Sequence, residues 1–192
     1  TSRAINFVQS IGKLPVVVKD SPGFLVNRIL LPYLIEAMRL FSEGHSMDSI
    51  DKTMLDFGMP MGPLRLLDEI GLDVAAHVAM DLEKKLEGFS VPHLVSKILK
   101  TKQFGRKSGK GFYLYKGSEA VCPNPLFLKM QGASSKSSDI ESKMINAMTE
   151  EAQKCMQEKI VKSSEDIDFA MIMGTGWAPF KGGPMEYSKT EG

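Results

Sequence analysis

An internal repeat restricts the fold of this chain more than any single residue does. Each of its two units begins with a stretch that has the apolar spacing of a long helix. A short acidic segment and a turn rich in glycine and proline follow in the same order. The aligned stretches are 34–43 with 149–158, 48–51 with 165–168, and Gly58 and Pro63 with Gly174 and Pro179. Chance similarity between two helical pairs is the alternative. Because the order agrees, we interpret the units as a duplication and expect pseudo-symmetric packing, as between the subunits of a homodimer.

From Asp20 onward, start and stop signals for helices follow one another. Asp20 and Pro22 open a long helix with Pro32 inside it. The predicted helices span residues 22–43, 47–57, 63–70, 73–86, 92–100, 139–158 and 164–173. Glycines and alternating apolar residues at 103–115 predict a loop or a short hairpin. The segment 117–138 is predicted to be a linker, because it is rich in turn-forming residues and ends in a serine-rich run.

The beginning of the chain has a different character. Residues 4–11 have the spacing of an amphipathic helix, which Gly12 ends. The apolar, β-branched run Leu14–Val18 is typical of a buried strand in a parallel sheet. One helix and one strand cannot form a sheet, so we expect the tail of an α/β domain and hence a piece of a longer polypeptide. The predicted organisation is this tail at 1–20, a first helical repeat at 21–116, the linker at 117–138, and a second helical repeat, complete or truncated, at 139–192.

Charge and cysteine content argue against several classes of function. The chain has 24 Lys and Arg residues against 23 Asp and Glu residues, a net charge of +1. Nucleic-acid-binding domains usually carry a clear basic excess, so no nucleic-acid partner is expected. No apolar run approaches the roughly 18 residues that a membrane span needs. Cys122 and Cys155 form no CxxC motif, which favours free thiols in a reducing compartment over a disulfide scaffold.

Asn27 is the sharpest candidate for a functional side chain. On the first long helix it shares a face with Leu31, Leu34 and Met38. An amide on an apolar stripe is costly unless it is hydrogen-bonded. Asn27 is therefore either a satisfied core or near-cap residue, or a donor aimed at a substrate oxygen in a cleft between domains. The aligned residue of the second unit is Ser142, so the two units are not equivalent.

Other candidates do not form a recognised constellation. His45, His77 and His93 lack the HxH or HExxH spacing of a metal site, so no metal is expected. The glycines at 174–176 resemble the start of a dinucleotide fingerprint. The sixth position of that motif is Pro179, however, and no predicted strand precedes it. We therefore expect no cofactor site in the chain.

Several motifs together resemble a known family over nearly the whole chain. They are residues 16–28 (VVVKDSPGFLVNR), 60–63 (PMGP), 67–73 (LDEIGLD) and 104–113 (FGRKSGKGFY). The chain resembles the C-terminal region of the L-3-hydroxyacyl-CoA dehydrogenases. Its second unit, with residues 176–184 (GWAPFKGGP), resembles the second copy in the multifunctional fatty-acid oxidation enzymes, which carry enoyl-CoA hydratase and dehydrogenase on one chain.

The resemblance implies an all-α, duplicated helical domain of the 6-phosphogluconate dehydrogenase C-terminal type, with a helix–strand remnant of a Rossmann domain. It implies NAD-dependent oxidation of L-3-hydroxyacyl-CoA to 3-ketoacyl-CoA in β-oxidation. The catalytic His and Glu of the family and its NAD site belong to the N-terminal domain, outside this chain. Asn27 matches the Asn of the Gly-Phe-x-x-Asn-Arg motif, which lies near the substrate carbonyl and the catalytic imidazole. We expect the isolated chain neither to bind NAD nor to turn over substrate.

The implied partners are an acyl-CoA substrate, the absent Rossmann domain, a hydratase domain on the same chain and a thiolase subunit. The implied compartment is the bacterial cytoplasm, or the mitochondrion or peroxisome in a eukaryote. Family members often carry His where this chain has Lys181. Residues 97–116 hold seven Lys or Arg and no acid, which indicates a solvated face or an attraction for an anionic ligand. Two alternatives stay open: a non-enzymatic helical interaction module, and the substrate domain of another Rossmann dehydrogenase.

Overall fold

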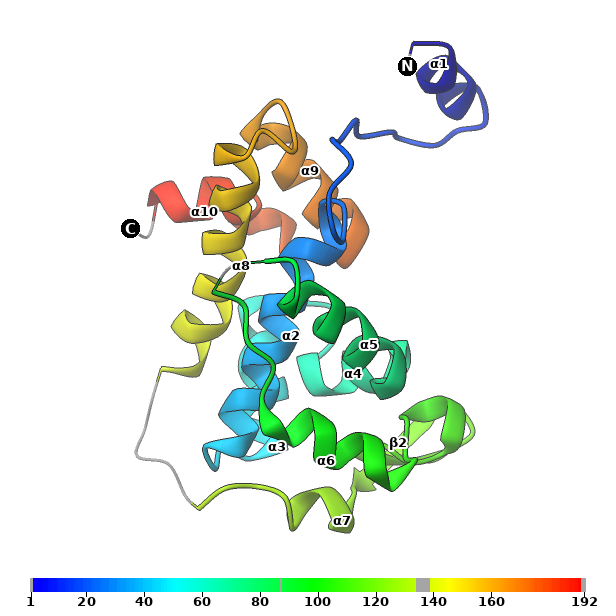
Figure 1. Cartoon of the computed structure of the whole chain (residues 1–192), viewed down its shortest axis with the longest axis vertical. Helices are drawn as coiled ribbons and strands as arrows, with labels where there is room; N and C mark the ends of the chain where they lie inside the picture. The colour runs from blue at the N-terminus through cyan, green and yellow to red at the C-terminus, as the bar shows by residue number, and fades with distance from the viewer. Residues whose placement is uncertain (1, 87, 134–138, 191–192) are drawn as a thin grey trace.

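The computed structural model describes residues 2–86, 88–133 and 139–190 (Figure 1). The serine-rich run at 134–138 of the predicted linker lies outside the described residues, as do residues 1, 87 and 191–192. The described part is mostly helical, with one small antiparallel hairpin, so the predicted all-α class is confirmed. None of the described helices combines the length and the apolar character that crossing a membrane requires.

The N-terminal arm consists of helix α1 (Ser2–Ser10) and an extended segment, and Figure 1 shows α1 apart from the other helices. The prediction of a helix here is confirmed, but the predicted strand at 14–18 is wrong. A strand needs a neighbouring strand to pair with, and the sheet of the described residues contains only the hairpin. Leu14 is 65% exposed. The arm returns to the body at Lys19, whose backbone N–H donates to the Ile160 carbonyl at 2.7 Å.

The first unit contains the long helix α2 (Val26–Ser42) and four shorter helices. They are α3 (Met47–Phe57), α4 (Pro63–Ile70), α5 (Leu72–Glu83) and α6 (His93–Thr101). The predicted bounds of α3 and α4 are confirmed, because strong local signals mark both. Ser46 caps α3 by accepting from the Ser49 N–H, and Gly58 ends it in the left-handed region at φ 113°.

The predicted linker carries more structure than its composition indicated. After the short 3-10 turn η1 (Arg106–Ser108), strand β1 (Tyr113–Lys116) pairs with β2 (Glu119–Pro123), and helix α7 (Pro125–Leu128) follows. Phe127 of α7 is fully buried, and its ring meets that of Phe112 edge-on at 5.2 Å. The glycine and prolines at 117–125 mark a hairpin turn and a helix start, and this segment packs on the first unit.

The second unit contains α8 (Ile140–Gln157), α9 (Ser164–Thr175), the 3-10 turn η2 (Pro179–Lys181) and α10 (Pro184–Thr190). Figure 1 shows α8 running alongside α2, the long helix of the first unit. Ser163 caps α9 by accepting from the Asp166 N–H, as Ser46 caps α3. Each unit thus presents its long helix to the other.

Matching aspartates confirm the duplication and fix its register. Asp51 accepts from the backbone N–H groups of Leu64 and Arg65, at 2.8 and 3.2 Å, at the start of α4. Asp168 does the same for residues 185 and 186 of α10, at 2.7 and 3.1 Å. In both helices the two capped N–H groups directly follow a proline at the first helical position.

This geometry corrects our alignment of the turns. Pro63 corresponds to Pro184, not to Pro179, because both stand directly before the capped N–H groups. Gly58 corresponds to Gly176, since both end their helices at positive φ, so the pairing with Gly174 was wrong. The second unit has an extra turn, η2, between its two helices, and a sequence comparison without spatial information cannot place such an insertion.

Candidate functional site

The start of α2 is built by an unusual turn. Gly23 and Phe24 both have positive φ, 76° and 53°, and Phe24 is a bulky residue in a region that favours glycine. Leu25 occupies the N-cap position and offers no side-chain acceptor to the helix. This turn delays the helix from the predicted start at residue 22 to Val26. Phe24 is 59% exposed, so its apolar ring is left at the surface.

Asn27 lies in the first turn of α2 and is exposed. Its amide has no hydrogen bond to any other described residue. The interpretation of Asn27 as a satisfied core residue is therefore wrong. Asn27 does share one face of α2 with Leu31, Leu34 and Met38. Those three side chains are buried, whereas Asn27 lies at the end of this face that reaches the surface.

Asn27 borders an apolar hollow with a cavity volume of about 210 Å³. The hollow is lined by residues of α2, α4 and α5: Asn27, Leu30, Leu31, Leu34, Ile70, Val74, Ala75 and Val78. Among these described residues, Asn27 is the one polar side chain. Ile70 and Val74 are 37% and 46% exposed, so apolar surface faces solvent beside a free amide. Such a combination suits an elongated apolar ligand with one polar end.

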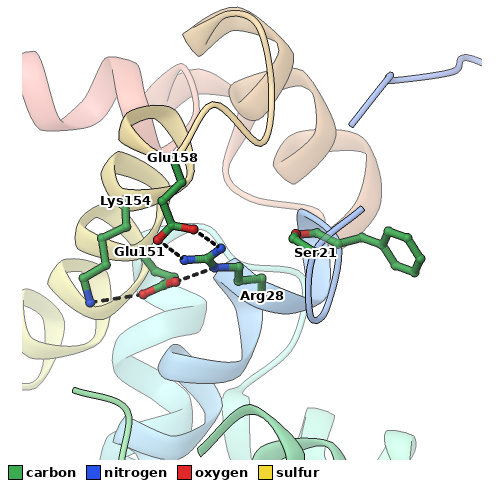
Figure 2. A network of polar contacts seen from close by, with 6 residues as sticks. Ser21, Arg28, Glu151, Lys154 and Glu158 are labelled. Carbon is green, nitrogen blue, oxygen red and sulfur yellow. Dashed lines mark hydrogen bonds and ion pairs between the residues drawn. The ribbon is translucent and has the colours of Figure 1, made fainter. Parts of the chain in front are cut away.

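Directly after Asn27, Arg28 joins the two units (Figure 2). Its Nε donates to Glu151 Oε1 at 2.7 Å, and its two terminal nitrogens donate to the two oxygens of Glu158, each at 2.7 Å. The Arg28 side chain is 2% exposed. The Glu158 carboxylate raises the pKa of Arg28 above its usual range, and Arg28 lowers the pKa of Glu158. Lys154 adds an ion pair to Glu151 at 3.2 Å. In the sequence Arg28 stands out only as the last residue of the motif at 16–28, which by itself predicts no role for it.

The equivalent positions of the second unit are arranged differently. Lys143 is the counterpart of Arg28, and it pairs with Glu43, the counterpart of Glu158, at 3.2 Å. This reciprocal pairing is typical of two-fold packing. Ser142, the counterpart of Asn27, donates its hydroxyl to Asp139 at 2.6 Å. The site in the first unit therefore has a free amide, whereas in the second unit the equivalent group is already bonded.

Two buried carboxylates were not anticipated from the sequence. Burial raises the pKa of Asp51 and of Asp68 to about 6 each. Asp68 accepts from the N–H groups of residues 112 and 113 and from the Tyr115 hydroxyl. Asp51 accepts the Tyr113 hydroxyl at 2.7 Å in addition to capping α4. Asp68 of α4 thus binds backbone N–H groups at the start of the hairpin, whereas Asp51 of α3 binds those of α4 and the Tyr113 hydroxyl of β1, so we assign both carboxylates structural roles.

None of the three histidines lines the hollow that Asn27 borders. His77 is exposed, with Nδ1 2.7 Å from the Asp73 carbonyl of its own helix, and His93 is exposed at the start of α6. Lys181 lies over the rings of Phe57 and Tyr187, 5.1 and 5.6 Å from their centroids, and so contributes to packing.

The structure also shows where the glycines at 174–176 and the basic residues at 97–116 lie. Gly174 lies inside α9 and Gly176 ends it, which is not the strand–turn–helix context of a dinucleotide site. Of the basic residues at 97–116, Arg106 pairs with Glu69 and Lys107 with Asp73. Within the described residues, no group of His, Cys, Asp and Glu is arranged to hold a metal ion.

Comparison with known proteins shows what this part of the chain is similar to. The family model described as "3-hydroxyacyl-CoA dehydrogenase, C-terminal domain" matches residues 23–115. Residues 23–115 are therefore similar to the C-terminal domain of the 3-hydroxyacyl-CoA dehydrogenases. The matched region contains the start of α2, Asn27, the apolar hollow and most of strand β1.

Curated relatives match the second unit as well. A fatty acid oxidation complex subunit alpha from Shewanella halifaxensis is 40% identical over 98% of the chain. The same kind of subunit from Vibrio cholerae is 41% identical over 94% of the chain. The chain spans only 27% and 26% of the lengths of these two relatives. The chain thus corresponds to about a quarter of such a subunit.

Solved structures share the fold. The dehydrogenase part of a multifunctional enzyme from Caenorhabditis elegans is 28% identical, covers 92% of the chain and superposes with a TM-score of 0.64. The chain covers 42% of that structure. The 3-hydroxybutyryl-CoA dehydrogenase of Escherichia coli covers 100% of the chain with a TM-score of 0.81, and the chain covers 57% of it. At 21% identity the second likeness shows the fold alone.

Proposed function

We propose that this chain is the substrate-side part of an NAD-dependent 3-hydroxyacyl-CoA dehydrogenase of fatty-acid β-oxidation. The observation that carries the proposal is the free amide of Asn27 beside the apolar hollow, within a domain of this family. In this role Asn27 donates a hydrogen bond to the substrate oxygen that becomes the carbonyl. The same contact keeps the substrate aligned with the catalytic imidazole.

The cofactor and the catalytic His–Glu pair are proposed to come from a Rossmann domain on the same polypeptide. Dinucleotide sites are built on a parallel sheet with a glycine-rich turn at a helix start, and the described residues contain no parallel sheet. The residues present therefore do not fit NAD, and no step through the cofactor is assigned to them. The length of the curated relatives leaves room for that domain.

The hollow is proposed to receive the acyl chain of the substrate. The walls of the hollow are aliphatic. Asn27, the polar residue at its border, would lie at the reacting end of the acyl chain. A methylene moved from water into such a site contributes about 0.8 kcal/mol. Substrate affinity in this arrangement grows with chain length until the hollow is full.

The wider setting is proposed on the same basis. A hydratase domain on the same chain and a thiolase subunit would complete a fatty-acid oxidation complex of the kind named for the relatives. Both cysteines are free thiols, Cys122 exposed and Cys155 buried. Free thiols fit a reducing compartment such as the bacterial cytoplasm, and the mitochondrion or peroxisome is the corresponding proposal for a eukaryote.

The test is Asn27→Ala in the full-length protein that contains this chain. Turnover of 3-hydroxyacyl-CoA with NAD should fall about 100-fold, the lower end for a lost polar stabiliser. Stability should be unchanged within about 0.5 kcal/mol, because the amide has no partner among the described residues. The matched control is Asn146→Ala, which removes an exposed amide from α8 outside the hollow and should leave turnover unchanged.

The outcomes separate the alternatives. Equal turnover in the two variants would show that Asn27 has no role in the reaction. A full-length protein that does not oxidise 3-hydroxyacyl-CoA at all would favour the non-enzymatic interaction module.

A further inference from the structure

The position of Asn27 depends on a helix start that its own sequence stabilises poorly. The N-cap Leu25 provides no side-chain hydrogen bond, and Phe24 holds a positive φ. A local contact comes from Ser21, whose hydroxyl donates to the Phe24 carbonyl at 3.0 Å. The Arg28 N–H also donates to the Gly23 carbonyl, at 3.3 Å. The first N–H groups of a helix have no partner within the helix, so a start without a side-chain cap frays easily unless other parts of the protein hold it.

The second unit supplies that support through Arg28. Three hydrogen bonds of 2.7 Å tie its guanidinium to Glu151 and Glu158, so that rotation and translation of the guanidinium are both restricted (Figure 2). The bidentate geometry with Glu158 gives directional as well as charge complementarity. Lys154 holds the second oxygen of Glu151 at 3.2 Å. Asn27 is the adjacent residue, so it lies directly beside this anchor in the chain.

Two more contacts from the second unit converge on this helix start. A Cβ placed on Gly174 of α9 would lie 3.3 Å from Val26 Cγ1, so α9 passes close to the residue before Asn27. The Lys19 N–H donates to the Ile160 carbonyl in the connection between α8 and α9. Segments before and after the turn are therefore both attached to the second unit.

From these contacts we infer that the second unit positions Asn27 for the reaction and that Arg28 is the positioning residue. Glu151 and Glu158 of α8 act through Arg28, and none of the three needs to touch substrate. The inference rests on the proposed function of Asn27. It assigns to the second unit a part in catalysis as well as in packing, because a displacement of about 1 Å at a catalytic group can cost 100-fold in rate.

A double-mutant cycle on kcat in the full-length protein tests this inference. Arg28→Lys keeps a buried positive charge but cannot make the bidentate contact, and Glu158→Gln removes the charge of a carboxylate that is 50% exposed. Each change should lower kcat about 10-fold in the otherwise unchanged protein. In an Asn27→Ala background the same changes should alter kcat less than about 2-fold, because a missing amide cannot be misplaced.

The matched control is Lys143→Gln. It breaks the equivalent ion pair, Lys143 with Glu43, at the other end of the same pair of helices. Its kcat should equal that of the unchanged protein. Hydrogen exchange at residues 23–30 provides a readout independent of activity and should increase in Glu158→Gln but not in Lys143→Gln.

Equal fold losses of kcat with and without Asn27 would overturn the inference, and so would an unchanged kcat in both Arg28→Lys and Glu158→Gln. Failure of the proposed function looks different. In that case Asn27→Ala alone leaves turnover unchanged, whereas the exchange measurement still reports on the contact of Arg28 with α8.

Discussion

The proposed function predicts that blocking the apolar hollow changes which acyl chains the full-length protein accepts. Val74 lines the hollow and is 46% exposed, so Val74→Trp can fill the space without overpacking the core. If about four methylenes of a long chain occupy the hollow, at about 0.8 kcal/mol each, their loss costs roughly 3 kcal/mol. That corresponds to a decrease on the order of 100-fold in kcat/KM for the long substrate.

The assay compares two substrates in the full-length protein by following NADH formation. The kcat/KM for 3-hydroxydodecanoyl-CoA should fall as calculated, whereas that for 3-hydroxybutyryl-CoA should change less than about 2-fold, because a short chain does not fill the hollow. Val121→Trp is the matched control, since Val121 is 62% exposed on β2 and lies outside the hollow. Equal losses for both substrates would refute the placement of the acyl chain, because they would indicate a general disturbance of the domain.

Two further predictions concern buried ionisable groups. Burial raises the pKa of Asp68 to about 6, so between about pH 4 and pH 6 the folded state binds a proton that the unfolded state has released. The free energy of unfolding should therefore decrease with rising pH in this window, relative to Asp68→Asn; urea titrations that give a pH-independent difference would contradict the assignment. Cys122 is exposed, whereas Cys155 is fully buried with a pKa raised to about 11. A thiol reagent should label Cys122 alone in the native chain, and rapid labelling of Cys155 would show that the interface between α2 and α8 opens.

Local signals in the sequence determined most of the helices. Ser46 and Gly58 mark α3 because a hydroxyl acceptor and a left-handed glycine act within a few residues of the helix they delimit. The apolar periodicity of α2 likewise predicted which face of this helix is buried. The strand predicted at 14–18 failed for the converse reason, since a strand is stable only with a partner that the described part of the chain does not provide.

The tertiary structure decided how the repeat is aligned and where Asn27 lies. Gly58 pairs with Gly176 because both end a helix that precedes a capped turn, and the inserted turn η2 hides this equivalence in the sequence. Asn27 lies on the stripe that periodicity predicted. Only the packing of α4 and α5 beside α2 shows that the stripe ends at an open hollow.

By itself the sequence determined the helical class, the duplication, the family resemblance and Asn27 as a candidate, because these depend on periodicity, caps and short motifs. Only the tertiary structure showed that Arg28 reaches Glu151 and Glu158 and that Asp51 and Asp68 bind backbone N–H groups. Such contacts join residues far apart in the chain. They form because burial makes an unpaired charge or N–H group costly, and the partner that satisfies it is chosen by the packing of helices, which no local pattern encodes.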